Sequence, residues 1–238
     1  MSGDDPKLPS RSTSADVDAF LQRVAHTPMV KKAGERGRLL FALDATASRQ
    51  PTWDRACDLQ AAMFEETAAL GGLDVQLCYY RGFGEFHTTS WTPDALSLLR
   101  QMTGVSCLGG LTQIGKVLTH AVEETERKRV NALVFVGDCM EEDIDQLSHQ
   151  AGRLGILGVP AFLFQEGQDP AAERAFREIA RLTRGAHCRF DAGSAQQLRD
   201  LLSAVAVFAA GGRKALADFS RQRGGIVRQL THQVKGDR

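Results

Sequence analysis

Short apolar runs alternate with longer segments of helical periodicity along most of this chain, starting near residue 38. The run LLFAL at residues 39–43 has no polar interruption, which is typical of a strand covered on both faces. In the clearest helical segment, Ile114, Val117, Leu118 and Ala121 follow the i, i+3, i+4, i+7 spacing of one helix face. The pattern predicts strands over residues 39–43, 75–80, 85–91, 132–136, 159–164 and 186–190.

The order of these segments predicts the fold class. Strands that alternate with helices of about ten residues or more imply crossover connections, and therefore a parallel sheet with helices on both faces. The strand at residues 85–91 follows its predecessor after the short turn Gly82-Phe83-Gly84, so it is expected to be antiparallel. We therefore expect an α/β, Rossmann-like open sheet of about six strands, mostly parallel with one antiparallel edge strand.

Composition and charge predict three parts in the chain. Residues 1–37 are expected to be a polar N-terminal extension with a short helix that Ser14 caps. Residues 38–210 contain the strand–helix alternation and form the predicted domain. Residues 211–238 are expected to be a basic helical extension, since residues 212–238 hold seven Lys or Arg side chains and two Asp.

The overall charge argues against a nucleic acid or a membrane as partner, because Lys+Arg and Asp+Glu number 29 each. The polar N-terminus lacks the apolar core of a secretory signal. The five cysteines show no Cys-x-x-Cys spacing, which favours reduced thiols over a disulfide framework or a zinc site. Together these features predict a cytoplasmic protein.

Oxygen-bearing side chains follow three of the predicted elements. Asp44, Thr46 and Ser48 come directly after the first strand, Thr112 begins the helix after a glycine-rich loop, and Asp138 follows the fourth strand. In an open parallel sheet, ligand-binding groups gather beyond the carboxyl ends of the strands, so these side chains are expected to converge. Two carboxylates and three hydroxyls suit a hard cation such as Mg²⁺, with Mn²⁺ or Ca²⁺ as alternatives.

These residues resemble the metal-ion-dependent adhesion site (MIDAS) of the von Willebrand factor A (VWA) family, written Asp-x-Ser-x-Ser, a distant Thr and a distant Asp. The resemblance covers roughly residues 38–209 and assigns all five residues as the metal site. It implies that Thr46 and Ser48 coordinate through their hydroxyls, and that Thr112 switches between direct and water-mediated contact. It also implies that Asp44 and Asp138 anchor the ion largely through bound water.

The resemblance implies a function as well as a fold. The chain is expected to be a non-enzymatic protein-interaction module, in which the bound cation accepts an Asp or Glu carboxylate from a protein partner. Thr46 replaces the more usual serine but keeps the hydroxyl. The acidic run Glu141-Glu142-Asp143 after Asp138 is expected to compete for the ion or to repel an acidic ligand.

Two alternatives stay open at the level of sequence. The first is a magnesium-dependent phosphatase of the haloacid dehalogenase type, with Asp44 as nucleophile and a magnesium motif in residues 137–143. Such enzymes usually place a second Asp two residues after the nucleophile, where this chain has Thr46. The second is a scaffold whose metal site is vestigial and whose terminal extensions bind the partner.

Overall fold

The computed structural model describes residues 36–50, 53–54, 56–58, 65–66, 72–190 and 195–222. The predicted N-terminal helix lies outside the described residues, as does the chain after residue 222. No helix within these described ranges is long and apolar enough to cross a bilayer.

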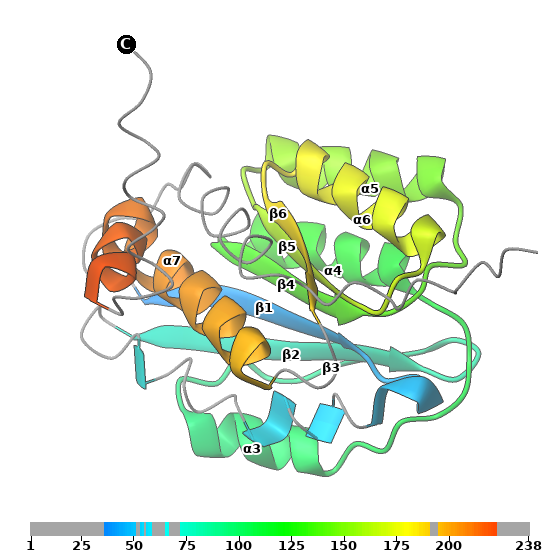
Figure 1. The fold of residues 1–238 in the computed structure, drawn as a ribbon, viewed down its shortest axis with the longest axis horizontal. Helices are drawn as coiled ribbons and strands as arrows, with labels where there is room; N and C mark the ends of the chain where they lie inside the picture. The colour runs from blue at the N-terminus through cyan, green and yellow to red at the C-terminus, as the bar shows by residue number, and fades with distance from the viewer. Residues whose placement is uncertain are drawn as a thin grey trace, which may run out of the picture.

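Six strands form one sheet in the order β3-β2-β1-β4-β5-β6 (Figure 1). All neighbouring pairs are parallel except β2 and β3, which are antiparallel. The expected α/β sheet with one antiparallel edge strand is therefore confirmed. The strands are β1 (Gly37–Asp44), β2 (Leu73–Arg81), β3 (Glu85–Thr88), β4 (Ala132–Gly137), β5 (Ala161–Glu166) and β6 (Ala186–Phe190).

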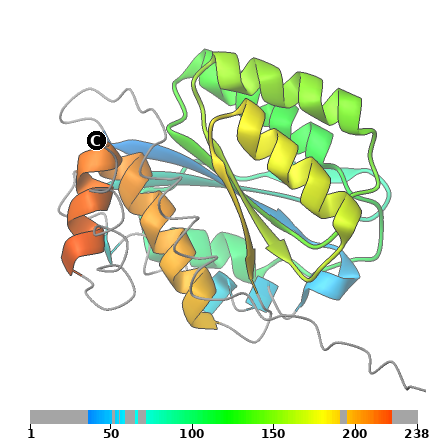
Figure 2. The same cartoon turned by 45° about the horizontal axis from the view of Figure 1, so that its top comes forward.

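Helices cover both faces of the sheet, as Figures 1 and 2 show. On one face lie α4 (Ile114–Arg127), α5 (Ile144–Ile156) and α6 (Pro170–Leu182). On the other lie α3 (Ala95–Thr103) and α7 (Ala195–Gln222).

The strand β1 shows why an uninterrupted apolar run fits this position. Its side chains alternate between the two faces, so Leu39 and Phe41 pack in the core under α7, while Leu40 and Ala42 pack under α4 to α6. At the start of β1 the backbone comes very close to α7, because a Cβ on Gly37 would lie 2.4 Å from the carbonyl oxygen of Ala209. Glycine is therefore required at residue 37.

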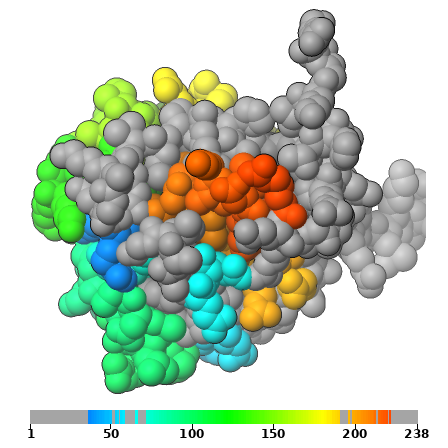
Figure 3. Space-filling view, turned by 90° about the vertical axis from the view of Figure 1, so that its left-hand side faces the viewer, coloured from blue at the N-terminus to red at the C-terminus, as the bar shows by residue number. Residues whose placement is uncertain are grey.

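The long helix α7 bends at Gly212, whose φ of 75° is outside the helical region. Its apolar residues up to Ala210 pack against the sheet, and Leu216 beyond the bend is still buried. The C-terminal half of the helix, orange to red in Figure 3, reaches the surface on that side of the molecule.

Candidate metal centre

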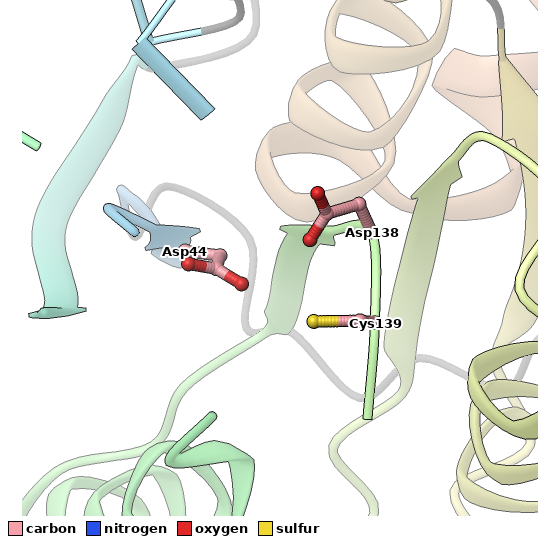
Figure 4. Close-up of side chains that lie close together, drawn as sticks. All are labelled: Asp44, Asp138 and Cys139. Carbon is pink, nitrogen blue, oxygen red and sulfur yellow. The ribbon is translucent and has the colours of Figure 1, made fainter. Parts of the chain in front are cut away.

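The centre of the sheet places two of the expected ligands side by side. The strand β1 pairs with β2 on one side and with β4 on the other, and Leu43 is in register with Val136. The chain order therefore reverses between β1 and β4, which is where open α/β sheets bind ligands. Asp44 ends β1 and Asp138 follows β4, and both lie at this point (Figure 4).

Asp44 is a buried carboxylate, with 2% of its surface exposed. Its Oδ1 accepts a hydrogen bond of 2.8 Å from the backbone N–H of Thr46, and its Oδ2 accepts one of 3.0 Å from the hydroxyl of Tyr80. Burial raises the pKa of the Asp44 carboxyl above its usual range. The hydrogen bond from Thr46 opposes this pKa shift, and the negative charge of Asp138 adds to it.

Asp138 and Ser48 form a hydrogen bond between the loop that follows β4 and the loop that follows β1. The Ser48 hydroxyl donates a hydrogen bond of 3.0 Å to Oδ2 of Asp138. The other carboxylate oxygen, Oδ1, is buried and has no hydrogen-bond partner within the described part of the chain. A buried carboxylate oxygen without a donor is costly, so this atom is available to a bound ion or to a water.

Cys139 lies beside these two carboxylates, and the sequence pattern did not single it out as a ligand. Its Sγ and one oxygen each of Asp44 and Asp138 all lie within 4.8 Å of one another (Figure 4). Burial raises the pKa of the Cys139 thiol to about 12, and the neighbouring Asp138 and Asp44 charges contribute. The predicted ligand set contained only oxygen donors and did not include this thiol. The sequence alone does not show in which direction a half-buried side chain points.

Thr112 is joined to the loop that carries Asp138. Its hydroxyl accepts a hydrogen bond of 3.0 Å from the backbone N–H of Glu141, and its own N–H donates one of 3.1 Å to Oε2 of that residue. The structure therefore brings Asp44, Ser48 and Asp138 together directly. Thr112 is connected to this group indirectly, because it bonds to Glu141 in the loop that carries Asp138.

The acidic run after Asp138 binds backbone amides. Oxygens of Glu142 accept hydrogen bonds of 2.5 Å from Ile114 N–H and 2.9 Å from Gly115 N–H, at the start of α4. Asp143 caps α5 by accepting two further N–H bonds. These carboxylates thus satisfy the free amides and the positive dipole end of two helices, and the expected effect of the acidic run on the ion stays a prediction.

The loops around the site are held to one another by backbone contacts. The N–H of Leu108 donates to the carbonyl oxygen of Ala45 at 3.0 Å, and Gly82 bonds both to Leu108 and to Leu111. A Cβ on Gly110 would lie 1.9 Å from the carbonyl oxygen of Gly82, so only glycine permits this approach. The glycine-rich loop predicted from the sequence is therefore fixed against the loop that follows β1.

The donor atoms fit a divalent cation. Neither Asp44 nor Asp138 forms a salt bridge with any Lys, Arg or His that the structure describes. Two adjacent carboxylates, one of them buried, are costly without a compensating positive charge. Carboxylate and hydroxyl oxygens are the ligands that hard divalent cations take in proteins.

Comparisons with known proteins agree with this architecture. No protein-family model matches the sequence, and no curated protein matches it. Among solved structures, the SpRpn10 VWA domain is 15% identical with a TM-score of 0.54, and the match covers 71% of this chain and 94% of that one. The von Willebrand factor domain of the type V pilus tip protein Mfa5 from Porphyromonas gingivalis is 9% identical with a TM-score of 0.57, covering 72% and 94%.

A third similar structure is that of proximal thread matrix protein 1 (PTMP1) from the mussel byssus, described as having a zinc-occupied MIDAS motif. It is 14% identical with a TM-score of 0.58, and the match covers 74% of this chain. This chain spans 49% of the length of that protein. At these identities the likeness establishes the fold.

Proposed function

Because this chain has the fold of a von Willebrand factor A domain, we propose that it is a non-enzymatic protein-interaction module that depends on a divalent cation. The cation accepts an Asp or Glu carboxylate from a protein partner. The observation that carries the proposal is the buried carboxylate of Asp44 beside Asp138, without a cationic side chain among the described residues to balance either charge.

In this proposal Asp44, Thr46, Ser48, Thr112 and Asp138 hold the ion. Three of the five ligands are neutral hydroxyls, so the cation keeps much of its positive charge and attracts an outside carboxylate. Mg²⁺ is the ion that the five oxygen donors favour, with Mn²⁺ or Ca²⁺ as alternatives. The zinc-occupied MIDAS motif of PTMP1 supports a metal at this place in the fold.

The proposed setting is the cytoplasm. None of the five cysteines, all of which the structure describes, forms a disulfide, which suits a reducing compartment. Cys57, Cys78 and Cys188 are buried, and burial raises the pKa of the Cys78 thiol to about 12. Thiols of this kind are poor nucleophiles and are consistent with packing roles.

Glu142 is the residue that separates this proposal from the phosphatase alternative. A phosphatase of that type would use its carboxylate on magnesium, whereas here both oxygens of Glu142 accept backbone N–H groups of α4. A Glu142→Gln variant should therefore keep its affinity for the cation and lose about 1 kcal/mol of stability through the weaker helix cap. Loss of metal binding in Glu142→Gln, together with turnover of a phosphate ester by the wild type, would favour the enzyme.

The metal part of the proposal is tested by thermal unfolding with added cation. At a free cation concentration of 100 times its Kd, binding should stabilise the wild type by about 2.7 kcal/mol. Asp44→Asn and Asp138→Asn should show little of this increase in Tm. The matched control is Asp145→Asn, an exposed acid on α5, which should respond as the wild type does. Equal increases in Tm in all four proteins would contradict the proposed metal site and favour the alternative in which the protein is a scaffold with a vestigial site.

The partner part is tested with a displayed random-peptide library selected on the Mg²⁺-loaded protein and eluted with EDTA. We expect the recovered peptides to share an Asp or Glu, and its replacement by Asn or Gln to abolish binding. Peptides that bind equally well in EDTA would contradict a carboxylate–cation contact.

A further inference from the structure

Cys139 places a soft donor in a site that the sequence predicts to be built from oxygen alone. The residue follows Asp138 directly, at the end of β4. Figure 4 shows its sulfur on the same side of the strand end as the Asp138 carboxylate, facing Asp44. The three donor atoms lie within 4.8 Å of one another, a spacing that one ion can bridge after small side-chain movements.

Two independent features point to a cation among these three donors. Oδ1 of Asp138 is buried without a hydrogen-bond partner in the described ranges, and one oxygen of the same carboxylate lies in a cluster with the Cys139 sulfur. Asp44 is almost completely buried, and its carboxylate has no ion-pair partner among the described side chains. A cation bound by both carboxylates and the sulfur would satisfy both features.

We propose that Cys139 is a ligand of the metal and gives this centre a preference for Zn²⁺ over Mg²⁺. The inference rests on the proposed metal site and goes further by naming the residue that selects the ion. Zn²⁺ forms short bonds to thiolate sulfur, about 2.3 Å, whereas Mg²⁺ takes oxygen ligands almost exclusively. As the Zn–S bond forms, the Sγ–H bond breaks and its proton passes to solvent.

A preference for Zn²⁺ follows from the number of donors as well as from their type. Zn²⁺ is satisfied by four ligands, and Asp44, Asp138 and Cys139 supply three donor side chains in one place, which leaves a fourth position for the partner's carboxylate. Mg²⁺ requires near-ideal octahedral geometry and usually keeps several waters, so the sulfur contributes nothing to its binding. Removing the sulfur should therefore affect one ion and spare the other.

The test compares Cys139→Ser with wild type by calorimetric titration of the reduced full chain with Zn²⁺ and with Mg²⁺. Cys139→Ser should bind Zn²⁺ about tenfold more weakly or worse, while its Mg²⁺ affinity changes little. Cys107→Ser is the matched control, because Cys107 is a half-buried thiol near the site that does not belong to the cluster. Its affinity for both ions should equal that of the wild type.

Cobalt supplies a second readout, because Co²⁺ replaces Zn²⁺ and gives a thiolate-to-metal charge-transfer band in the near ultraviolet. The wild type and Cys107→Ser should show this band, and Cys139→Ser should lack it. Absence of the band from the Co²⁺-loaded wild type would overturn the proposal even if the Cys139→Ser variant does not fold.

The outcomes separate this inference from the proposed function. If Zn²⁺ binds wild type and Cys139→Ser equally well, and Asp44→Asn abolishes binding, the metal site stands and the role of Cys139 is wrong. If neither ion binds the wild type, both proposals fail. A Cys139→Asp variant, which exchanges the sulfur for a hard oxygen, should reverse the preference towards Mg²⁺, and an unchanged preference would also overturn the inference.

Discussion

Removing one partner of the ion pair between Arg49 and Glu166 should cost several kcal/mol, because the pair is largely shielded from water. Arg49 lies in the short helical turn η1 (Ala47–Arg49), directly after Ser48, and its Nη1 donates to Oε2 of Glu166 at the end of β5. The side chains are 2% and 15% exposed. The pair therefore fastens the loop after β1 to a strand on the other side of β4.

The magnitude follows from this burial. Removing one partner of a buried pair typically costs about 3–5 kcal/mol, because the remaining charge loses its closest counter-charge in a place poorly reached by water. Glu166 is partly exposed and can recruit water, so Arg49→Met should cost about 3 kcal/mol, near the lower limit. For a domain of this size, that loss corresponds to a decrease in Tm of roughly 6–12 °C.

Urea unfolding of a double-mutant cycle measures the pair itself. Arg49→Met and Glu166→Leu should each be strongly destabilising, whereas the double variant should recover about 2 kcal/mol relative to their sum, since two apolar side chains leave no buried charge. The control cycle uses Arg181 and Glu178 on α6, whose side chains are 67% and 33% exposed, and its coupling should stay below about 1 kcal/mol. Additive effects in the Arg49–Glu166 cycle would refute the buried contact.

Two further predictions concern the loops at the site. In EDTA, burial raises the pKa of the Asp44 carboxyl, so ionising this carboxyl costs stability as the pH rises above about 4, its usual value in an unfolded chain. Asp44→Asn should therefore gain stability relative to the wild type as the pH is raised from that value, and a difference in unfolding free energy that does not vary with pH would contradict this. Gly110→Ala should cost about 2 kcal/mol or more in urea unfolding, because its Cβ would overlap the carbonyl of Gly82, whereas Gly109→Ala meets no atom within 4 Å and should be nearly neutral. Equal losses in the two alanine variants would show that the two loops do not approach as described.

The fold could be predicted from the sequence because its signals are local. An uninterrupted apolar run such as β1 is typical of a strand with both faces covered, and the spacing in α4 is typical of a helix with one buried face. The short turn after Arg81 likewise required an antiparallel partner for β2. Each feature depends on residues close together in the chain.

The sequence predicted those parts of the candidate site whose positions depend on where the strands end. Asp44 and Asp138 could be placed together because both follow strands of a parallel sheet. The contact between Glu142 and the start of α4 joins residues far apart in sequence and has no local signal. The direction of the Cys139 sulfur likewise depends on the backbone of one loop, which no spacing rule fixes.

The contacts around the site explain how two carboxylates can be held close together before an ion arrives. Repulsion between Asp44 and Asp138 tends to separate the loops after β1 and β4. The bond from Leu108 to Ala45, the bond from Ser48 to Asp138 and the Arg49–Glu166 pair oppose that separation. The fold thus retains the cost of the repulsion, which the proposed cation would relieve. The proposed metal site therefore links metal affinity to folding stability, so a substitution that loosens these contacts should weaken the binding of the proposed ion without touching a ligand.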